Sequence, residues 1–212
     1  MSNDIELYLI RHAEAKMNTM SHLINGRSND SPLTEFGRRQ AIMLGDFLLD
    51  RGMLPTKIFT SPAVRTLMTS KITLNRMGLN ENPTVSADLQ ELDQGDWVGK
   101  NRQETYSPEV IKKISKLGKN FKAPSGESMN EVGSRMFNWI DINVDSGNND
   151  ENINKIFVFT HGLAIRCLAS YIDNWSHEKT FKTRTPNASI SLFNVTNKLL
   201  SLNYIGLETS SI

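Results

Sequence analysis

The chain contains almost no cysteine. Cys167 is the single cysteine among 212 residues, so an internal disulfide and a cysteine-based structural zinc site are both excluded. The fold must then be stabilised by its own hydrophobic core, and a chain of this length can bury enough surface to form one. A chain without disulfides suits a reducing compartment, and we expect a cytoplasmic protein.

The sequence also lacks an excess of charge of either sign and any long apolar run. Its 24 Lys and Arg residues nearly balance 23 Asp and Glu residues, for a formal net charge of +1. This balance argues against nucleic acid as a partner, because nucleic-acid binders carry strongly basic surfaces. No apolar run approaches the roughly 18 residues that a membrane span requires, and residues 1–6 carry acids where a secretory signal carries bases. We therefore expect neither nucleic acid nor a membrane as a partner.

Several common catalytic and binding motifs are missing or incomplete. Gly-x-Gly-x-x-Gly and Gly-x-Ser-x-Gly do not occur, which removes the sequence support for dinucleotide binding and for a serine-hydrolase elbow. The run from Gly95 to Lys100 has one residue too few between its glycines for a phosphate-binding P-loop. Cys167 has Asp173 six positions later, where a cysteine phosphatase needs an arginine. We expect Cys167 to be a buried structural residue.

Short runs of β-branched and aromatic residues alternate with longer segments of helical periodicity. This alternation predicts a three-layer α/β/α fold with a mainly parallel sheet, in one domain over residues 1–212. The last two strands flank the polar residues 196–198, which predicts a C-terminal antiparallel hairpin. The expected strands span 6–10, 57–60, 84–87, 155–160, 189–195 and 199–205. The expected helices span 34–50, 128–143 and 163–174, with another opening at 61, and 145–154 is expected to be a surface loop.

Two of these helices have specific start signals. Thr34 is the expected N-cap of the first, and Glu35 suits the positive end of its dipole. Ser61 is the expected N-cap of the second, with Pro62 at its first helical position. The second helix is expected to bury an apolar stripe of Val64, Leu67, Met68 and Ile72.

The segment 95–126 fits the alternation least well. We predict that it is an inserted lid between a strand and the following helix. Five lysines lie between Lys112 and Lys122 with no acid among them. They form either a solvated helix face or a site that attracts a second anionic group of the substrate.

Basic side chains follow three of the expected strands at the point where each strand ends. Arg11 and His12 follow the first strand, His161 follows the fourth, and Arg65 lies in the first turn of the helix after the second. The carboxyl ends of parallel strands meet at one edge of a sheet, where open α/β folds bind ligands. Two arginines and two histidines there suit a phosphoryl group, through charge-assisted hydrogen bonds, or a carboxylate.

A metal ion fits this cluster less well. Histidine is the commonest metal ligand, but adjoining arginines repel a cation, and neither His-x-x-x-His nor His-Glu-x-x-His occurs. We predict neither a metal nor a cofactor. His22 and His177 have polar neighbours and no partner motif, so we expect surface positions for both.

The segment from Leu9 to Asn18 resembles the signature of the histidine phosphatase superfamily, the cofactor-dependent phosphoglycerate mutase-like proteins. Other segments resemble family segments in family order: 31–41, 61–65, 91–99, 126–128 and 160–162. The resemblance covers most of the chain. Ala13 departs from it, because most members have glycine there.

The resemblance implies a role for each residue of the cluster. His12 would be the nucleophile that forms a phosphohistidine, with one ring nitrogen facing phosphorus and the other donating its proton to a group such as a backbone carbonyl. Arg11, Arg65 and a cationic His161 would hold the phosphoryl oxygens. Glu91 matches the general acid, which protonates the leaving oxygen and then activates water.

The resemblance leaves other assignments open. Asp93 and Asp96 lie close to Glu91 in the chain and rival it as the acid. Asn18, Arg27 and Asn187 are candidates for substrate or phosphate contacts, each balanced against a loop-capping role.

The expected reaction is hydrolysis of a small phosphorylated substrate, as a phosphoric monoester hydrolase. Only 35 positions separate Glu91 from Gly126, whereas a mutase has to keep its phosphoenzyme dry under a longer closing segment. The alternatives are a phosphoglycerate mutase and a non-catalytic phosphate-binding regulatory module. The oligomeric state stays open between monomer and homodimer.

Overall fold

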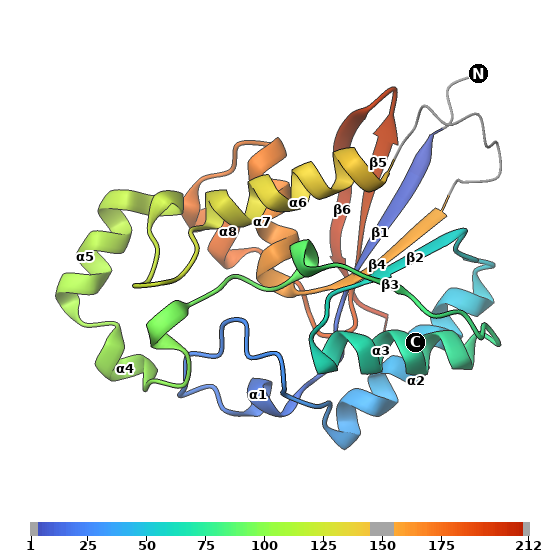
Figure 1. Cartoon of the computed structure of the whole chain (residues 1–212), viewed down its shortest axis with the longest axis horizontal. Helices are drawn as coiled ribbons and strands as arrows, with labels where there is room; N and C mark the ends of the chain where they lie inside the picture. Colours follow the sequence, from blue (N-terminus) through green and yellow to red (C-terminus); the bar gives the residue numbers. More distant parts are fainter. Residues whose placement is uncertain (1–3, 145–154, 210–212) are drawn as a thin grey trace.

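The computed structural model describes residues 4–144 and 155–209, and a six-stranded mixed sheet forms its middle layer (Figure 1). The sheet order is β3-β2-β4-β1-β5-β6, and β1 to β4 run parallel to one another. β5 pairs antiparallel with both β1 and β6, so the predicted C-terminal hairpin is confirmed. The strands are β1 Ile5–Arg11, β2 Lys57–Thr60, β3 Thr84–Val85, β4 Lys155–Thr160, β5 Ile190–Thr196 and β6 Leu199–Leu207. The predicted loop at 145–154 lies outside the described residues.

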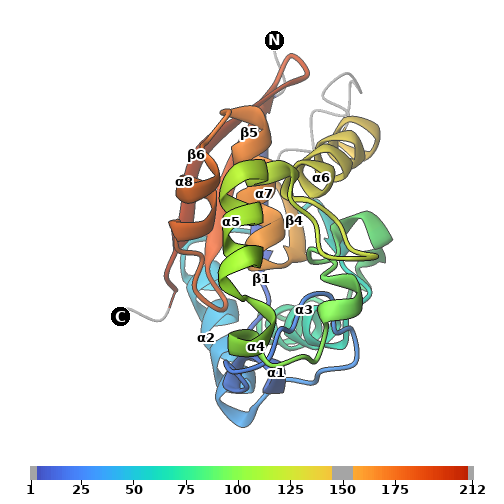
Figure 2. The same ribbon diagram turned by 90° about the vertical axis from the view of Figure 1, so that its left-hand side faces the viewer.

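Helices cover both faces of this sheet (Figures 1 and 2). Side chains alternate along β1, so Leu7 and Leu9 pack in the core under α6 and α7, whereas Tyr8 and Ile10 pack in the core with α2 and α3. The predicted three-layer α/β/α architecture is therefore confirmed. The helices are α1 Lys16–Thr19, α2 Glu35–Asp50, α3 Val64–Arg76, η1 Ala87–Leu89, η2 Gly95–Trp97, α4 Arg102–Thr105, α5 Pro108–Leu117, η3 Gly118–Asn120, α6 Met129–Asn143, α7 Gly162–Ile172 and α8 His177–Lys182. Within the two described ranges, no helix combines the length and the apolar content that crossing a bilayer requires.

The helix starts follow the predicted capping chemistry in α2 but not in α3. The Gly37 N–H donates to Thr34 Oγ1 over 2.9 Å, so Thr34 is the N-cap of α2 as predicted. The prediction that Ser61 caps α3 is wrong, because α3 begins at Val64 and has Ala63 as its N-cap. The Ser61 hydroxyl instead lies 2.9 Å from His161 Nε2, at the edge of the sheet.

The buried face of α3 is polar. The predicted apolar stripe is wrong, because Leu67 is 36% exposed while Thr69 and Thr73 are fully buried. Thr73 Oγ1 donates to the carbonyl of Ala41 in α2, and Thr69 Oγ1 accepts from the Ala13 N–H. Hydroxyls that bind neighbouring backbone groups therefore position α3 against the sheet and the loop after β1.

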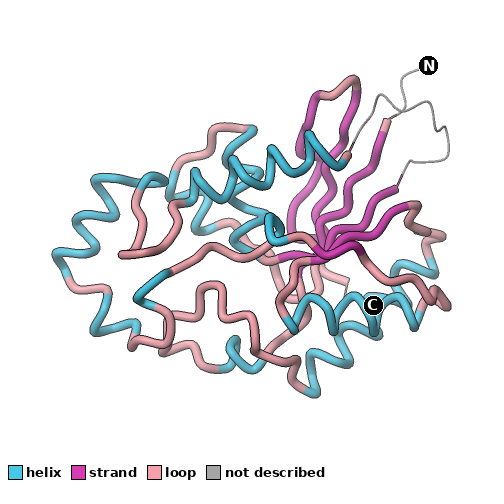
Figure 3. The backbone as a smooth tube through the Cα atoms, in the orientation of Figure 1, coloured by secondary structure: helices cyan, strands magenta, loops and turns pink. Residues whose placement is uncertain are grey.

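The 95–126 segment consists of short helices joined by loops, next to the end of the molecule that α5 occupies (Figure 3). It encloses a small apolar cluster of its own around Trp97, whose ring lies 5.6 Å from that of Tyr106 and 5.7 Å from that of Phe121 between centroids. Ile24, from the loop after α1, completes this cluster. The segment is thus folded independently of the sheet core, although it contacts the N-terminal part of the chain.

The two ends of this segment meet at a narrow neck, formed by residues 93–96 and 124–127. The Asp96 N–H donates to the Pro124 carbonyl over 3.0 Å, and the Glu127 N–H donates to the Asp93 carbonyl over 2.9 Å. Gly95 has a φ of +48°, and a Cβ there would lie 2.1 Å from the Pro124 carbonyl oxygen. Only glycine fits this approach of the two chain segments.

Candidate active site

Four basic side chains converge at the carboxyl edge of the parallel strands. Arg11 ends β1 opposite Thr160 in β4, and His12 is the next residue. His161 follows β4 as the N-cap of α7, and Arg65 is the second residue of α3, after β2. The His12 and His161 ring centroids are 5.3 Å apart. The structure thus brings together the four residues that the strand ends predict.

His12 is held as a neutral ring with one free nitrogen. Its Nδ1 lies 2.8 Å from the Ala13 carbonyl oxygen and therefore carries the proton, which leaves the Nε2 lone pair free. Burial, and then the charges of Arg11 and Arg65, hold the pKa of His12 well below its usual range. An unprotonated, oriented nitrogen at neutral pH is what a nucleophilic histidine requires.

The backbone around His12 is tied in place from both sides. Its carbonyl accepts from the Asn187 side-chain amide over 3.0 Å and from the Ala188 N–H over 3.2 Å. On the other side the Ala13 N–H donates to Thr69. Ala13 is fully buried and is not one of the described residues with positive φ, so alanine fits there without backbone strain.

His161 is neutral, and the expectation of a cationic His161 is wrong for this structure. Arg65 Nη2 lies 3.0 Å from His161 Nδ1, and a guanidinium can only donate, so Nδ1 is the acceptor. His161 Nε2 then carries the proton and donates to Ser61 Oγ over 2.9 Å. Burial and the Arg65 charge hold the pKa of His161 well below its usual range. The positive charge of the site therefore resides on its arginines.

Arg11 and Arg65 each keep one unused buried donor. Arg11 Nη1 donates to the Thr185 carbonyl over 2.6 Å, and Arg65 Nη1 donates to the Ser28 carbonyl over 2.6 Å. Over residues 4–144 and 155–209, nothing accepts from the Nε–H of either guanidinium, although both atoms are buried. Burial lowers the pKa of both groups, that of Arg65 to about 10, so both stay cationic at neutral pH. Two buried cationic donors without acceptors fit an anionic ligand.

Gly162 makes room for Arg11. A Cβ at position 162 would lie 3.0 Å from Arg11 Nε and 2.9 Å from Thr185 Oγ1. Gly162 is not in the left-handed region, so the requirement here is space rather than φ. The glycine after His161 therefore sets how closely the guanidinium can approach the start of α7.

Glu91 lies at the amino-terminal end of α7. Its carboxylate accepts from the Ala164 N–H over 2.9 Å and from the Leu163 N–H over 3.2 Å. Negative charge is stabilised at a helix N-terminus, and these donors fix the carboxylate beside His161. Its rivals Asp93 and Asp96 lie in the neck, where Asp93 accepts from the Gly95 N–H and Asp96 accepts from the Ser125 hydroxyl.

An ion-pair network holds the backbone of Glu91. Arg27 Nη2 lies 2.7 Å from Glu127 Oε2, and Arg135 Nε lies 3.0 Å from Glu127 Oε1. Both arginines also donate to the Glu91 carbonyl, over 3.2 Å from Arg27 Nε and 3.3 Å from Arg135 Nη2. The pKa of Glu127 is lowered because hydrogen bonds and charge from Arg135 and Arg27 outweigh its burial. Sequence reasoning missed Arg135, since no motif distinguishes it from other helix-face arginines, and gave Glu127 no role although it lies in a family-like segment.

The three other predicted contact residues have partners within the protein. Asn18 Oδ1 accepts from the Ala15 N–H over 2.9 Å, which is a loop-capping contact. Asn187 supports the carbonyl of His12, and Arg27 belongs to the Glu127 network. All three thus lie around the cluster, and their contact with a substrate stays a prediction.

The described part of the chain contains no competing reactive centre of two other kinds. No group of three or more His, Cys, Asp or Glu residues within it is arranged to hold a metal ion. Cys167 is 1% exposed, and burial raises the pKa of its thiol far above the ordinary value, as suits a structural cysteine.

Comparisons with known proteins bear on the family. A model of the histidine phosphatase superfamily (branch 1) matches residues 7–206. Proteins of Yersinia pestis and Yersinia pseudotuberculosis, each named probable phosphoglycerate mutase GpmB, are 33% identical to this chain over 195 residues. The match covers 88% of this chain and 83% of theirs.

Solved structures share the fold. A mycobacterial glucosyl-3-phosphoglycerate phosphatase matches with a TM-score of 0.80 at 21% identity, over 96% of this chain and 99% of its own. A phosphoglycerate mutase from Bacillus anthracis matches with a TM-score of 0.81 at 24% identity, over 98% and 95%. One neighbour is named a phosphatase and the other a mutase, so the fold alone does not separate the two reactions. With a family model spanning nearly all of it and relatives at 33% identity, the chain belongs to the histidine phosphatase superfamily.

Proposed function

We propose that this chain hydrolyses small phosphate monoesters through a phosphohistidine formed on His12. The observation that carries the proposal is the neutral His12 ring beside two buried guanidinium groups, Arg11 and Arg65, each with an Nε–H that no described group accepts. A phosphoryl group would supply acceptors to both donors and present phosphorus to the free nitrogen of His12.

In the first step, His12 Nε2 attacks phosphorus and the bond from phosphorus to the alcohol oxygen breaks. Protonated Glu91 gives its proton to the departing oxygen, so a neutral alcohol leaves. Arg11 and Arg65 stabilise the charge on the phosphoryl oxygens as the transition state forms. His161 positions the Arg65 guanidinium by accepting its Nη2–H, and is itself held by Ser61.

In the second step, Glu91 takes a proton from water while the water oxygen attacks phosphorus. The bond from phosphorus to His12 Nε2 breaks, and inorganic phosphate leaves. Histidine and protonated Glu91 are thereby restored. Arg27, Arg135 and Glu127 act as positioning residues in this scheme, because they hold the Glu91 backbone rather than the reacting atoms.

The test is hydrolysis of p-nitrophenyl phosphate in the presence of a chelator, together with trapping of the intermediate. Rapid quenching with a ³²P-labelled substrate should give protein-bound label that is labile in acid and stable in base. His12→Ala should abolish both the label and the turnover, whereas the matched exposed variant His22→Ala should keep both. No turnover over a broad panel of phosphate monoesters, or label that persists in His12→Ala, would contradict the proposal.

A phosphoglycerate mutase is the second candidate, because the curated relatives named above carry that description at 33% identity. It requires conversion of 2-phosphoglycerate to 3-phosphoglycerate that bisphosphoglycerate stimulates. A non-catalytic phosphate-binding module would instead bind phosphate without turning over any ester. We also propose that the protein acts in the cytoplasm, where the lone buried thiol of Cys167 stays reduced.

A further inference from the structure

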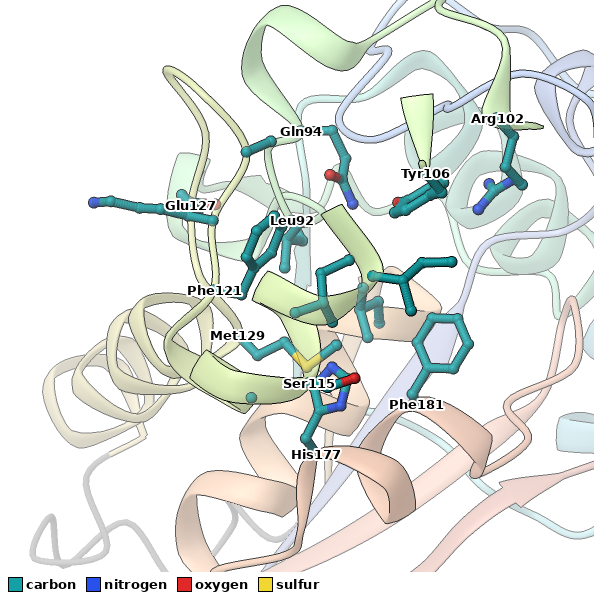
Figure 4. Close-up of a pocket in the computed structure, with 16 residues that line it drawn as sticks. Leu92, Gln94, Arg102, Tyr106, Ser115, Phe121, Glu127, Met129, His177 and Phe181 are labelled. Carbon is teal, nitrogen blue, oxygen red and sulfur yellow. The ribbon is translucent and has the colours of Figure 1, made fainter. Parts of the chain in front are cut away.

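A cavity of about 390 Å³ adjoins the candidate active site (Figure 4). Two of its lining residues connect it directly to Glu91: Leu92 is the next residue, and the Leu163 N–H donates to the Glu91 carboxylate. The cavity therefore lies on the side of Glu91 from which a leaving alcohol would receive its proton. Its volume lies within the range of sites that bind small molecules.

The walls of this cavity are largely apolar. Figure 4 shows Tyr106 and Arg102 on one side and His177 and Phe181 on the other. The apolar side chains come from α5, α8, the Glu91 loop and the residues that follow α4 and η3: Leu92, Tyr106, Ile111, Ile114, Phe121 and Phe181. These segments lie far apart in the sequence and meet only around this space.

Two large apolar side chains lie exposed at the cavity. Ile111 is 52% exposed and Phe181 is 60% exposed, and α5 has no buried residue. The amphipathic helix α5 thus turns Ile111 and Ile114 toward the cavity rather than into a protein core. An apolar group placed between α5 and α8 would remove this surface from water, which is favourable.

The charged residues that line the cavity have partners within the protein. Arg102 donates to the Ser21 and Leu23 carbonyls, and Lys122 lies 2.9 Å from a Glu131 carboxylate oxygen. Glu127, the third, is held in the ion-pair network described above. Of the five lysines between 112 and 122, only Lys122 lines the cavity, which favours a solvated face for the others. A second anionic group on the substrate would thus meet charges that are already paired.

We infer that this cavity receives the alcohol portion of the substrate and selects an apolar one, of the size of an aromatic ring with a short chain. The inference rests on the proposed function, because the phosphoryl group has to sit at His12 for the alcohol to project past Glu91. A polyhydroxylated or carboxylate-bearing alcohol would lose its hydration against Ile111, Ile114 and Phe181 without gaining partners. Such alcohols are therefore poor substrates.

The test compares 2-phenylethyl phosphate with glycerol 1-phosphate, since both release a primary alcohol and so differ mainly in polarity. We expect kcat/KM to be at least about tenfold higher for the phenylethyl ester, as burial of a ring face predicts. Ile111→Ser and Phe181→Ser should each lower kcat/KM for the phenylethyl ester about fivefold and leave that for glycerol 1-phosphate within about twofold. Leu54→Ser, at an equally exposed leucine after α2, should change neither value.

The outcomes separate this inference from the proposed function. Equal kcat/KM values for the two esters, or equal losses on both esters in Ile111→Ser, would overturn the inference and leave the phosphatase proposal intact. Turnover of neither ester would overturn the phosphatase proposal instead. In that case calorimetry with 2-phenylethylphosphonate and methylphosphonate still tests the cavity: about tenfold tighter binding of the former supports it, and equal affinities overturn it.

Discussion

Lowering the pH from 7.5 to 5.5 should destabilise the protein through two buried histidines. His12 is 3% exposed and His161 is fully buried, and burial together with neighbouring arginines holds the pKa of each well below the usual range. In the unfolded chain the same rings have pKa values near 6.5. As the pH falls below 6.5, the unfolded state binds protons that the folded state refuses, so the free energy of unfolding decreases.

The size of this effect follows from proton linkage. A ring that stays neutral when folded costs about 1.4 kcal/mol of stability between pH 7.5 and 5.5, and two such rings cost about 2.7 kcal/mol. Carboxylates of the unfolded chain take up protons mainly below about pH 5, so they contribute little in this window. The loss is a sizeable part of the 5–15 kcal/mol by which domains are typically stable.

The assay is urea unfolding at both pH values, followed by tryptophan fluorescence in a phosphate-free buffer so that no anion binds the site. His12→Gln should reduce the pH-dependent loss to about 1.4 kcal/mol, whatever it does to stability at pH 7.5. The exposed control His22→Gln should keep the full loss. A loss below about 0.5 kcal/mol in the wild-type chain, or an unchanged loss in His12→Gln, would refute the assignment of neutral buried rings.

Three further predictions concern the groups around the reacting atoms. Gly162→Ala should displace Arg11 and lower kcat/KM for p-nitrophenyl phosphate by about 10- to 100-fold in steady-state kinetics, and unaltered kinetics would show that the close approach is unimportant. Glu127→Gln should lower kcat at least about tenfold by loosening the Glu91 backbone, whereas Glu131→Gln, which breaks an exposed ion pair, should leave kcat nearly unchanged; equal effects of the two would contradict a positioning role. Because the pKa of Arg65 is lowered to about 10, kcat/KM should fall as the pH rises through that value and the guanidinium loses its proton, and a flat pH–rate profile to pH 11 would count against this.

The residues that could be predicted from the sequence are those whose place depends on the course of the backbone. Arg11, His12 and His161 immediately follow strands, so the parallel topology alone brings them to one edge. Arg65 needed only a helix start near position 61, and it reached the site although α3 begins three residues later than the Ser61 N-cap predicts. The fold class followed from the same alternation of strands and helices.

What the sequence could not provide depends on which atoms meet in three dimensions. The neutral state of His161 arises from Arg65 donating to one ring nitrogen, a contact over 96 positions of chain. Arg135 supports the Glu91 loop from a helix face, where an arginine is ordinarily solvated. The cavity exists only because α5 and α8 face each other, and neither Ile111 nor Phe181 carries a local signal of that.

The neck at 93–96 and 124–127 makes the chain between its two halves an exchangeable cassette. Its backbone hydrogen bonds bring the ends together whatever lies between them, so the entropy of closing the loop grows only slowly with its length. Transplanting residues 97–123 from a relative should therefore alter which alcohols are accepted while the acid and the nucleophile keep their positions. Diversification of substrates in such a protein can proceed without touching the chemistry.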